Sequence, residues 1–183
     1  KNGTFLLRIE DIDQTRARPK WEDQICNDLT WLGLRWPAPV MRQSDRISVY
    51  QNTTKTLWNQ KLIYPCSCRR KDVLAATSAP QESAPLIGPD GVIYPGTCRG
   101  RTAQADPIPT AAALHMDMTK ACALAGMSSE LAHTAGDIVI SRRDMGTSYH
   151  LSVVVDDAAQ GVTDVVRGKD LERGGGEVAA VQD

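Results

Sequence analysis

Three cysteines are the residues of this sequence best suited to chemistry. Cys66 and Cys68 stand two residues apart in YPCSCRRKD, and Cys98 follows in VIYPGTCRG. In extended chain a pair at the first spacing cannot readily form a disulfide, because the bond needs a particular separation of the two Cβ atoms. Thiolates are common zinc ligands, and three of them leave one position of a tetrahedral site to fill.

A fourth ligand has two candidates. Tyr94 lies four residues before Cys98 and can offer its phenolate oxygen, and a water molecule is the alternative. Histidine would be more usual, but the histidines, at positions 115, 133 and 150, all lie downstream. The competing interpretation is that these cysteines are free thiols that pack as small hydrophobes. That role is expected for Cys26 and Cys122, which fall in helical patterns.

Charged residues in RIEDID form a second set, which contains Arg8, Glu10, Asp11 and Asp13. They follow a predicted strand at residues 4–9, and ligands of open α/β sheets bind at the carboxyl ends of strands. The set is therefore a candidate for contact with a small polar substrate. The alternative is a charged turn in which Asp13 caps the next helix.

A third set consists of Tyr149, in SYHLSVVVDD, and Arg167, in GVTDVVRGKD. An arginine at the end of a strand can hold a carboxylate with two parallel hydrogen bonds, and a tyrosine hydroxyl can share that task. The pair is a candidate site for an acidic substrate.

These residues must be positioned by an alternating pattern of strands and helices, which predicts an α/β fold. After the strand at 4–9, a helix is expected from Pro19 to Gly33, with apolar residues three or four apart, and this order favours a parallel sheet. Ser44 is expected to cap a second helix that leads to Cys66. Residues 75–106 are rich in Pro, Gly, Ser and Ala and predict a loop-dominated insertion that a metal would stabilise. GDIVISRRD, YHLSVVVDD and GVTDVVRG predict three more strands.

Composition narrows the class of protein. The 183 residues, 42% of them hydrophobic, suffice for a buried core, and a net charge of -1 argues against a uniformly basic nucleic-acid coat, although basic patches occur at 69–71, 99–101 and 142–143. No apolar run approaches the roughly 20 residues of a membrane span, so no membrane partner and a cytoplasmic setting are expected. Five cysteines, an odd number, fit metal ligands better than a disulfide framework. Because the chain starts with Lys and enters a strand at once, we expect it to be a fragment.

Over about residues 3–171 the sequence resembles the glutamyl-type class I aminoacyl-tRNA synthetases. TFLLRIEDIDQTR is similar to the strand-turn motif of that family, DLTWLGLRWP to the following helix end, IYPCSC to the entry into its acceptor-binding insertion, and YHLSVVVDDAAQGVTDVVRGKDL to its return to the nucleotide-binding fold. The resemblance implies an incomplete Rossmann-like catalytic domain over 1–64 and 136–183, truncated or divergent at its end, and a loop-rich zinc-binding insertion over 65–135.

Two details resemble the short glutamyl-Q subfamily, which attaches glutamate to the queuosine base of tRNA(Asp). The pattern C-x-C followed by Y-x-x-x-C is similar to its zinc set, whereas zinc-binding bacterial glutamyl enzymes tend to have histidine at the place of Gly100. QGVTDVVRGKDL is also similar to that subfamily. The implied cofactor is a structural zinc, with Cys66, Cys68, Tyr94 and Cys98 as ligands. The implied partners of a monomeric enzyme are L-glutamate, ATP with magnesium, and tRNA(Asp) bearing queuosine.

The resemblance also implies roles for the charged sets. Glu10 would meet the α-ammonium of glutamate, and Tyr149 and Arg167 would contact the same substrate. The two ATP-binding motifs of the family, one with histidine and one with lysine, are not found in the sequence, so we expect no catalytic residue and no activity from this chain alone. The alternatives are a discriminating glutamyl-tRNA synthetase that charges tRNA(Glu) and a non-catalytic, zinc-stabilised nucleic-acid-binding module.

Overall fold

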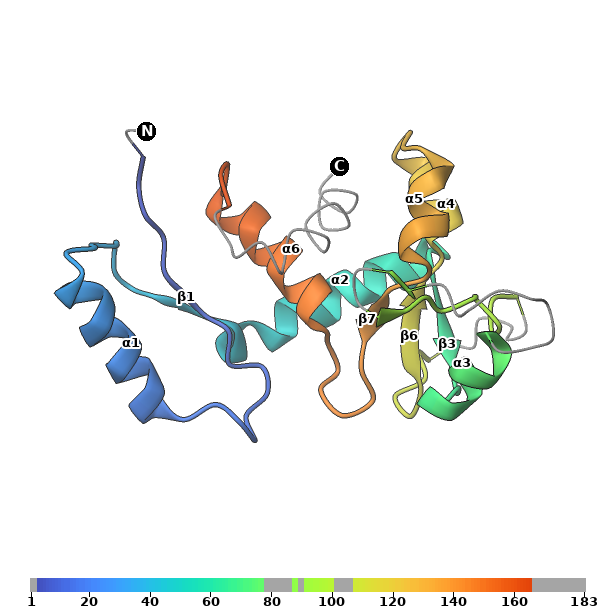
Figure 1. Ribbon diagram of the computed structural model, residues 1–183, viewed down its shortest axis with the longest axis horizontal. Coiled ribbons are helices and arrows are strands. Elements are labelled where there is room, and N and C mark those ends of the chain that lie inside the picture. The colour runs from blue at the N-terminus through green and yellow to red at the C-terminus, as the bar shows by residue number, and fades with distance from the viewer. Residues whose placement is uncertain (1–2, 78–86, 89–90, 101–106, 166–183) are drawn as a thin grey trace. The chain divides into compact units, whose positions relative to one another are not determined.

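The computed structural model describes residues 3–77, 87–88, 91–100 and 107–165 (Figure 1). The chain divides into two compact units, Lys1–Val49 and Tyr50–Asp183, and each is described by itself. Among the described residues, no helix has both the length and the apolar character needed to cross a membrane.

The first unit contains a short parallel strand pair and one long helix. Strand β1 (Arg8–Ile9) pairs in parallel with β2 (Met41–Arg42), as an α/β pattern predicts. Helix α1 (Pro19–Trp31) begins with proline at its first position, where a missing N–H costs nothing. It ends in a Schellman motif: Gly33 has φ of +79°, its N–H donates to Thr30 O, and Leu34 N–H donates to Leu29 O. The predicted helix is confirmed.

Three expectations for this unit are wrong in detail. The strand expected over 4–9 is limited to Arg8–Ile9, because only these residues pair with a neighbouring strand. Ser44 does not cap the next helix, α2 (Ile47–Asn59). It lies within the 3-10 helix η1 (Gln43–Arg46), and its N–H and hydroxyl donate to the carboxylate of Asp11 at 2.9 and 2.6 Å. Asp13 does not cap α1, since its carboxylate accepts from Thr15 in a local turn.

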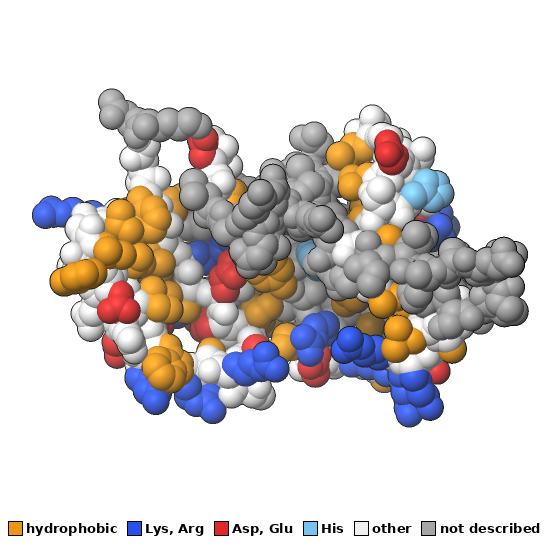
Figure 2. All heavy atoms as spheres, viewed as in Figure 1, with side chains coloured by type: hydrophobic (Ala, Val, Ile, Leu, Met, Phe, Trp, Pro, Cys, Tyr) orange, Lys and Arg blue, Asp and Glu red, His pale blue; other side chains and the backbone are white. Residues whose placement is uncertain are grey.

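The apolar face predicted for α1 is present but is not covered within the described structure. No residue of the helix is buried, and Trp21, Ile25 and Trp31 are 50%, 44% and 84% exposed. Figure 2 shows a group of apolar side chains, in orange, over α1. The periodicity thus predicted the helix correctly without indicating what covers it.

The second unit is built on an antiparallel sheet with strand order β3-β6-β7. The strands are β3 (Ile63–Cys66), β6 (Ala113–Met116) and β7 (Val139–Ser141), and Cys66 pairs with Ala113. The remaining elements of this unit are α3 (Arg70–Thr77), the hairpin β4 (Ile87–Gly88) and β5 (Gly91–Val92), α4 (Met118–Leu124) and α5 (Ser129–Ala135). Helix α2 (Ile47–Asn59) leads into the unit, and the buried Tyr50 hydroxyl donates to Asp156 of α6 (Tyr149–Gln160) at 2.7 Å.

Helix α6 corrects a prediction. The run YHLSVVVDD was expected to form a strand because valine favours strands, but it lies inside α6. Ser148 caps the helix by accepting from Leu151 N–H, and Gly161 ends it in the left-handed conformation. The two caps and the burial of Leu151 and Val154 together outweigh the intrinsic preference of the valines for strand structure. The strand predicted in GDIVISRRD is confirmed as β7, whereas residues 161–165 form no strand and the rest of GVTDVVRG lies outside the described residues.

Candidate metal centre and substrate-binding residues

Four side chains that sequence analysis proposed as metal ligands come together in the second unit. Cys66 ends strand β3 and Cys68 follows it, while Tyr94 and Cys98 lie in the loop after β5. The Sγ atoms of the three cysteines all lie within 4.8 Å of one another. Tyr94 Oη lies 3.2 Å from Cys66 Sγ and 3.8 Å from Cys68 Sγ, and Cys68 Sγ lies 3.5 Å from Cys98 Sγ.

These distances fit a tetrahedral zinc site. With Zn–S bonds of about 2.3 Å and Zn–O bonds of about 2.0 Å, a regular tetrahedron has S···S edges of about 3.8 Å and S···O edges of about 3.5 Å. The three donor separations lie close to those edges. Three thiolates and a phenolate oxygen could therefore hold zinc with little rearrangement, and they would occupy all four of its positions.

A glycine turn positions the last cysteine. Gly96 has φ of +71°, and Arg99 N–H donates to its carbonyl at 2.8 Å. A Cβ atom at Gly96 would lie 3.1 Å from Arg99 Nε and 3.2 Å from Asp137 Oδ2, closer than most real Cβ contacts. Within the turn, Cys98 N–H donates to Tyr94 Oη at 3.0 Å. Conformation and space both favour glycine at position 96.

The thiol and hydroxyl groups of this cluster differ in pKa. Burial raises the pKa of the Cys66 thiol to about 11 and raises the pKa of the Tyr94 hydroxyl well above its usual range. Burial also raises the pKa of Cys98, but hydrogen bonds with Tyr94 and Cys68 outweigh it and lower that pKa to about 7. Cys98 is therefore the thiol of these two that most readily reaches the ionised form that binds metals.

His115 lies beside the cluster without joining it. Its ring packs on that of Tyr94, with centroids 4.4 Å apart, and its Nδ1 lies 3.1 Å from the carbonyl oxygen of Asp137. Burial lowers the pKa of His115, so the neutral ring is favoured. The ring supports Tyr94, and among the described residues the group of possible metal ligands here contains Cys66, Cys68 and Cys98 and no histidine.

A buried carboxylate anchors the cysteine loop, and sequence reasoning missed it. Asp137, whose side chain is 0% exposed, accepts from Arg99 Nε at 3.0 Å, from Arg99 Nη2 at 2.5 Å and from Met118 N–H at 3.0 Å. The buried Tyr64 hydroxyl also donates to it. Arg99 follows Cys98 directly, so this network fixes the cysteine loop to the start of α4. The only sequence signal was the arginine next to the cysteine.

We expect Asp137→Asn to lower the free energy of unfolding by about 2 to 4 kcal/mol, because it removes the carboxylate that Arg99 pairs with most closely and leaves Arg99 only the longer ion pair with Asp117, at 3.6 Å. The expected loss of stability is smaller than for a fully buried ion pair, because the Arg99 side chain is 36% exposed. Urea unfolding followed by circular dichroism measures it. Asp144→Asn is the matched control, since Asp144 forms an exposed ion pair with Arg142 and should contribute less than about 1 kcal/mol. Equal effects of the two substitutions would contradict an anchoring role for Asp137.

Of the three predicted glutamate-binding residues, the structure describes two, Glu10 and Tyr149. Glu10 directly follows β1 in the first unit, and its side chain, 40% exposed, pairs with Arg8 Nη2 at 3.2 Å. It lines a cavity of about 460 Å³ together with Arg8 and Gln14. Tyr149 is the first residue of α6 in the second unit and is 45% exposed. Arg167 lies outside the described residues, so the joint role of these three residues remains a prediction.

Comparison with protein families places nearly the whole chain in one family. The model of the class I tRNA synthetases (E and Q), catalytic domain, matches residues 1–174. A glutamyl-Q tRNA(Asp) synthetase from Rhodobacter capsulatus is 50% identical over 186 residues, covering 92% of this chain and 66% of that protein. A glutamyl-Q tRNA(Asp) synthetase from Deinococcus radiodurans is 40% identical over 174 residues, covering 92% of this chain and 56% of that protein. The chain thus spans about half to two thirds of these relatives.

Solved structures agree on the fold. The crystal structure of a glutamate-tRNA synthetase from Elizabethkingia anophelis covers 98% of this chain and 40% of its own, with a TM-score of 0.66 and 21% identity. A glutamate tRNA ligase from Elizabethkingia meningosepticum, crystallised with its amino acid, covers 98% of this chain and 39% of its own, with a TM-score of 0.61 and 19% identity. At such identities the likeness shows the α/β fold alone.

Proposed function

The chain belongs to the class I tRNA synthetases of the glutamyl and glutaminyl type, and from that premise we propose that the full-length product of its gene activates glutamate with ATP and transfers it to the queuosine base of tRNA(Asp). One observation carries the proposal: 50% identity to a glutamyl-Q tRNA(Asp) synthetase over 92% of this chain. The Cys66, Cys68, Tyr94 and Cys98 cluster, with tyrosine as the fourth donor, supports it.

The proposed first step is attack by the α-carboxylate of glutamate on the α-phosphorus of ATP, which forms glutamyl-adenylate and releases pyrophosphate. A carboxylate is already ionised at neutral pH, so the step needs no general base. Rate enhancement must come from alignment of the two substrates and from neutralisation of phosphate charge, which bound magnesium would assist. The acceptor then attacks the activated carbonyl carbon and displaces AMP.

Glutamate recognition is assigned to Glu10, Tyr149 and Arg167. A carboxylate facing an ammonium group and a guanidinium facing a carboxylate form the charge-assisted hydrogen bonds that an amino-acid substrate requires. Glu10 is suited to the first role because its side chain is 40% exposed although it pairs with Arg8. Tyr149, at the start of α6, is 45% exposed, so a ligand can reach part of its side chain.

We assign the four-residue cluster to a structural zinc. Four protein ligands leave no open coordination position, so the ion would stabilise the loop and would not activate water. It would join the end of β3 to the loop after β5, which are 28 residues apart in sequence at Cys66 and Tyr94. This support suits a segment with little apolar core of its own.

A transfer assay with labelled glutamate tests the proposed function. The rival function is that of a discriminating glutamyl-tRNA synthetase. The two similar crystal structures are of glutamate-tRNA synthetases, but identities of 19% and 21% show only a common fold. The two functions differ in the RNA that accepts glutamate. A protein without catalysis would transfer glutamate to neither RNA.

A further inference from the structure

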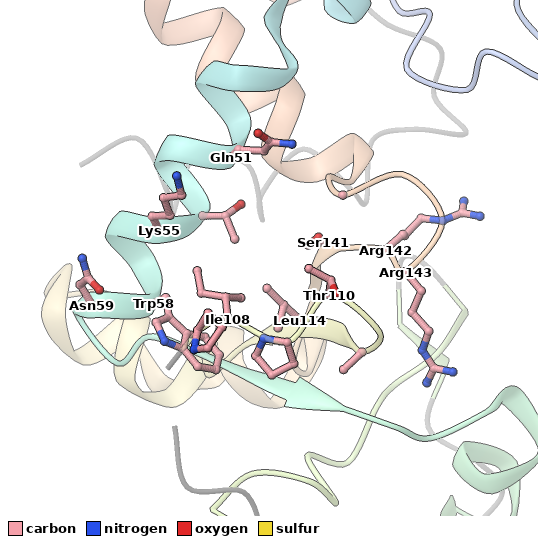
Figure 3. Close-up of a pocket in the computed structure, with 15 residues that line it drawn as sticks. Gln51, Lys55, Trp58, Asn59, Ile108, Thr110, Leu114, Ser141, Arg142 and Arg143 are labelled. Atoms are coloured by element: carbon pink, nitrogen blue, oxygen red, sulfur yellow. The ribbon is translucent and has the colours of Figure 1, made fainter. Parts of the chain in front are cut away.

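A cavity of about 580 Å³ lies within the second unit (Figure 3). We call it the α2 pocket, because helix α2 forms one wall; the loop before β6 and the loop after β7 form the rest. Its floor is apolar and includes Trp58, Ile108 and Leu114. Its volume falls in the range of about 300 to 1,000 Å³ that is usual for small-molecule sites.

The charged residues that line the α2 pocket all carry positive charge: Lys55, Arg142 and Arg143. Figure 3 shows Lys55 on the side of α2, and the two arginines on the opposite side. Arg142 is paired with Asp144 at 2.7 Å. In the part of the chain that the structure describes, no carboxylate lies within 4.0 Å of the charged groups of Lys55 or Arg143. Two cations therefore stand at opposite sides of an apolar floor without an acidic partner there.

Arg143 is held in place by the chain around Cys66 and Cys68. Its Nη2 donates to the carbonyl oxygens of Cys66 and Cys68 at 3.3 and 3.4 Å. These weak, neutral acceptors orient the guanidinium without neutralising its charge. The segment that carries two of the candidate zinc ligands, Cys66 and Cys68, thus also positions one cation of the α2 pocket.

An apolar floor between separated cations fits a ligand with a flat apolar body and anionic groups at its ends. A nucleotide in single-stranded RNA has this chemistry: its base can be unstacked onto an apolar surface, and the phosphates on either side need cations. A duplex does not fit, because its bases are already stacked and paired. Among the described residues no acid lines the pocket, so none of them would repel a polyanion there.

We infer that the α2 pocket binds one unstacked nucleotide of the RNA substrate, with its base on the floor and its phosphates at Lys55 and Arg143. The inference rests on the proposed function, which supplies the RNA. It adds a specific binding site that Arg143 links to the segment with Cys66 and Cys68.

Anisotropy titration of the full chain with an end-labelled tRNA(Asp) transcript tests the inference. Lys55→Ala should weaken binding about 5- to 10-fold and reduce the dependence of affinity on salt by about one counterion. Gln51→Glu, which adds a negative charge to the pocket wall at nearly constant shape, should weaken it at least about 3-fold. The matched controls are Lys71→Ala, on α3, and Gln60→Glu, just after α2. Both positions are exposed and do not line the pocket, and these variants should stay within about 2-fold of the original chain.

Four outcomes would overturn the inference. The first two are absence of RNA binding and equal affinities for the pocket variants and their controls. The third is equally tight binding of a blunt RNA duplex with the same sensitivity to Lys55→Ala, which would indicate a general basic surface. The fourth is displacement of the transcript by AMP at micromolar concentration, which would assign the pocket to a free nucleotide. RNA binding that depends on the pocket, without glutamate transfer, would instead contradict the proposed function and leave the pocket in place.

Discussion

Replacing Cys98 with serine is expected to lower the zinc affinity of the chain by at least about 100-fold, since even substitutions of groups that only support a ligand cost 10- to 100-fold. Serine removes one thiolate from a four-ligand site and offers a hydroxyl that stays protonated at neutral pH. Because binding energy at a structural site is also folding energy, the loop after β5 should lose protection from proteolysis. The original chain, purified without chelators, should carry about one zinc ion.

Two variants sharpen this experiment. Cys122→Ser is the matched control, because Cys122 is a buried free cysteine of α4 outside the cluster, and it should leave the zinc content unchanged. Tyr94→Phe removes one oxygen and keeps the buried ring, so it should weaken zinc binding about 10- to 100-fold in competition with a coloured chelator. Metal-free original protein would contradict the zinc assignment, and unchanged affinity of Tyr94→Phe would leave Tyr94 a packing role only.

Replacing Arg167 with alanine is expected to reduce glutamate activation by the full-length gene product by tens to thousands of fold. The substitution removes a bidentate contact and leaves a substrate carboxylate unpaired in a partly desolvated pocket, at a cost of about 2 to 5 kcal/mol. Glutamate-dependent exchange of labelled pyrophosphate into ATP measures this step. The loss should appear mainly as a raised KM for glutamate, with the KM for ATP little changed.

Arg167→Lys separates charge from geometry. Lysine keeps the positive charge but lacks the planar fork of guanidinium, so it should recover only part of the lost activity. Full activity of Arg167→Ala would refute the assignment of Arg167 to glutamate. Full recovery by lysine would show that charge alone suffices.

Local signals in the sequence predicted the elements that have distinct ends. Pro19 and Gly33 bracket α1 in the structure as they do in the sequence, because proline and glycine act through their own backbone geometry. The same local reasoning failed for α6, where the two caps and the burial of the middle of the helix outweigh the strand preference of three valines. Ser44 looked like a helix cap but bonds Asp11, which lies 33 residues away and could not be identified from sequence.

The proximity of Cys66, Cys68, Tyr94 and Cys98 could be predicted because all four have chemically distinctive side chains and two of them are nearly adjacent. The residues that support this cluster could not be predicted from the sequence. Asp137 meets Tyr64 across 73 residues and Arg99 across 38. The antiparallel pairing of β3, β6 and β7 brings Tyr64 close to Asp137, and the loop after β5 brings Arg99. Lys55 and Arg143 likewise meet at one pocket only through the fold, although the patch at 142–143 was visible in the sequence.

The most direct test of the proposed function is transfer of labelled glutamate by the full-length gene product to three purified RNAs. These are tRNA(Asp) bearing queuosine, the same tRNA with guanine in place of queuosine, and tRNA(Glu). We expect glutamate to become attached only to the first, because queuosine is the proposed acceptor and the 3′ end is not. Efficient charging of tRNA(Glu), or equal labelling of tRNA(Asp) without queuosine, would contradict the proposed function.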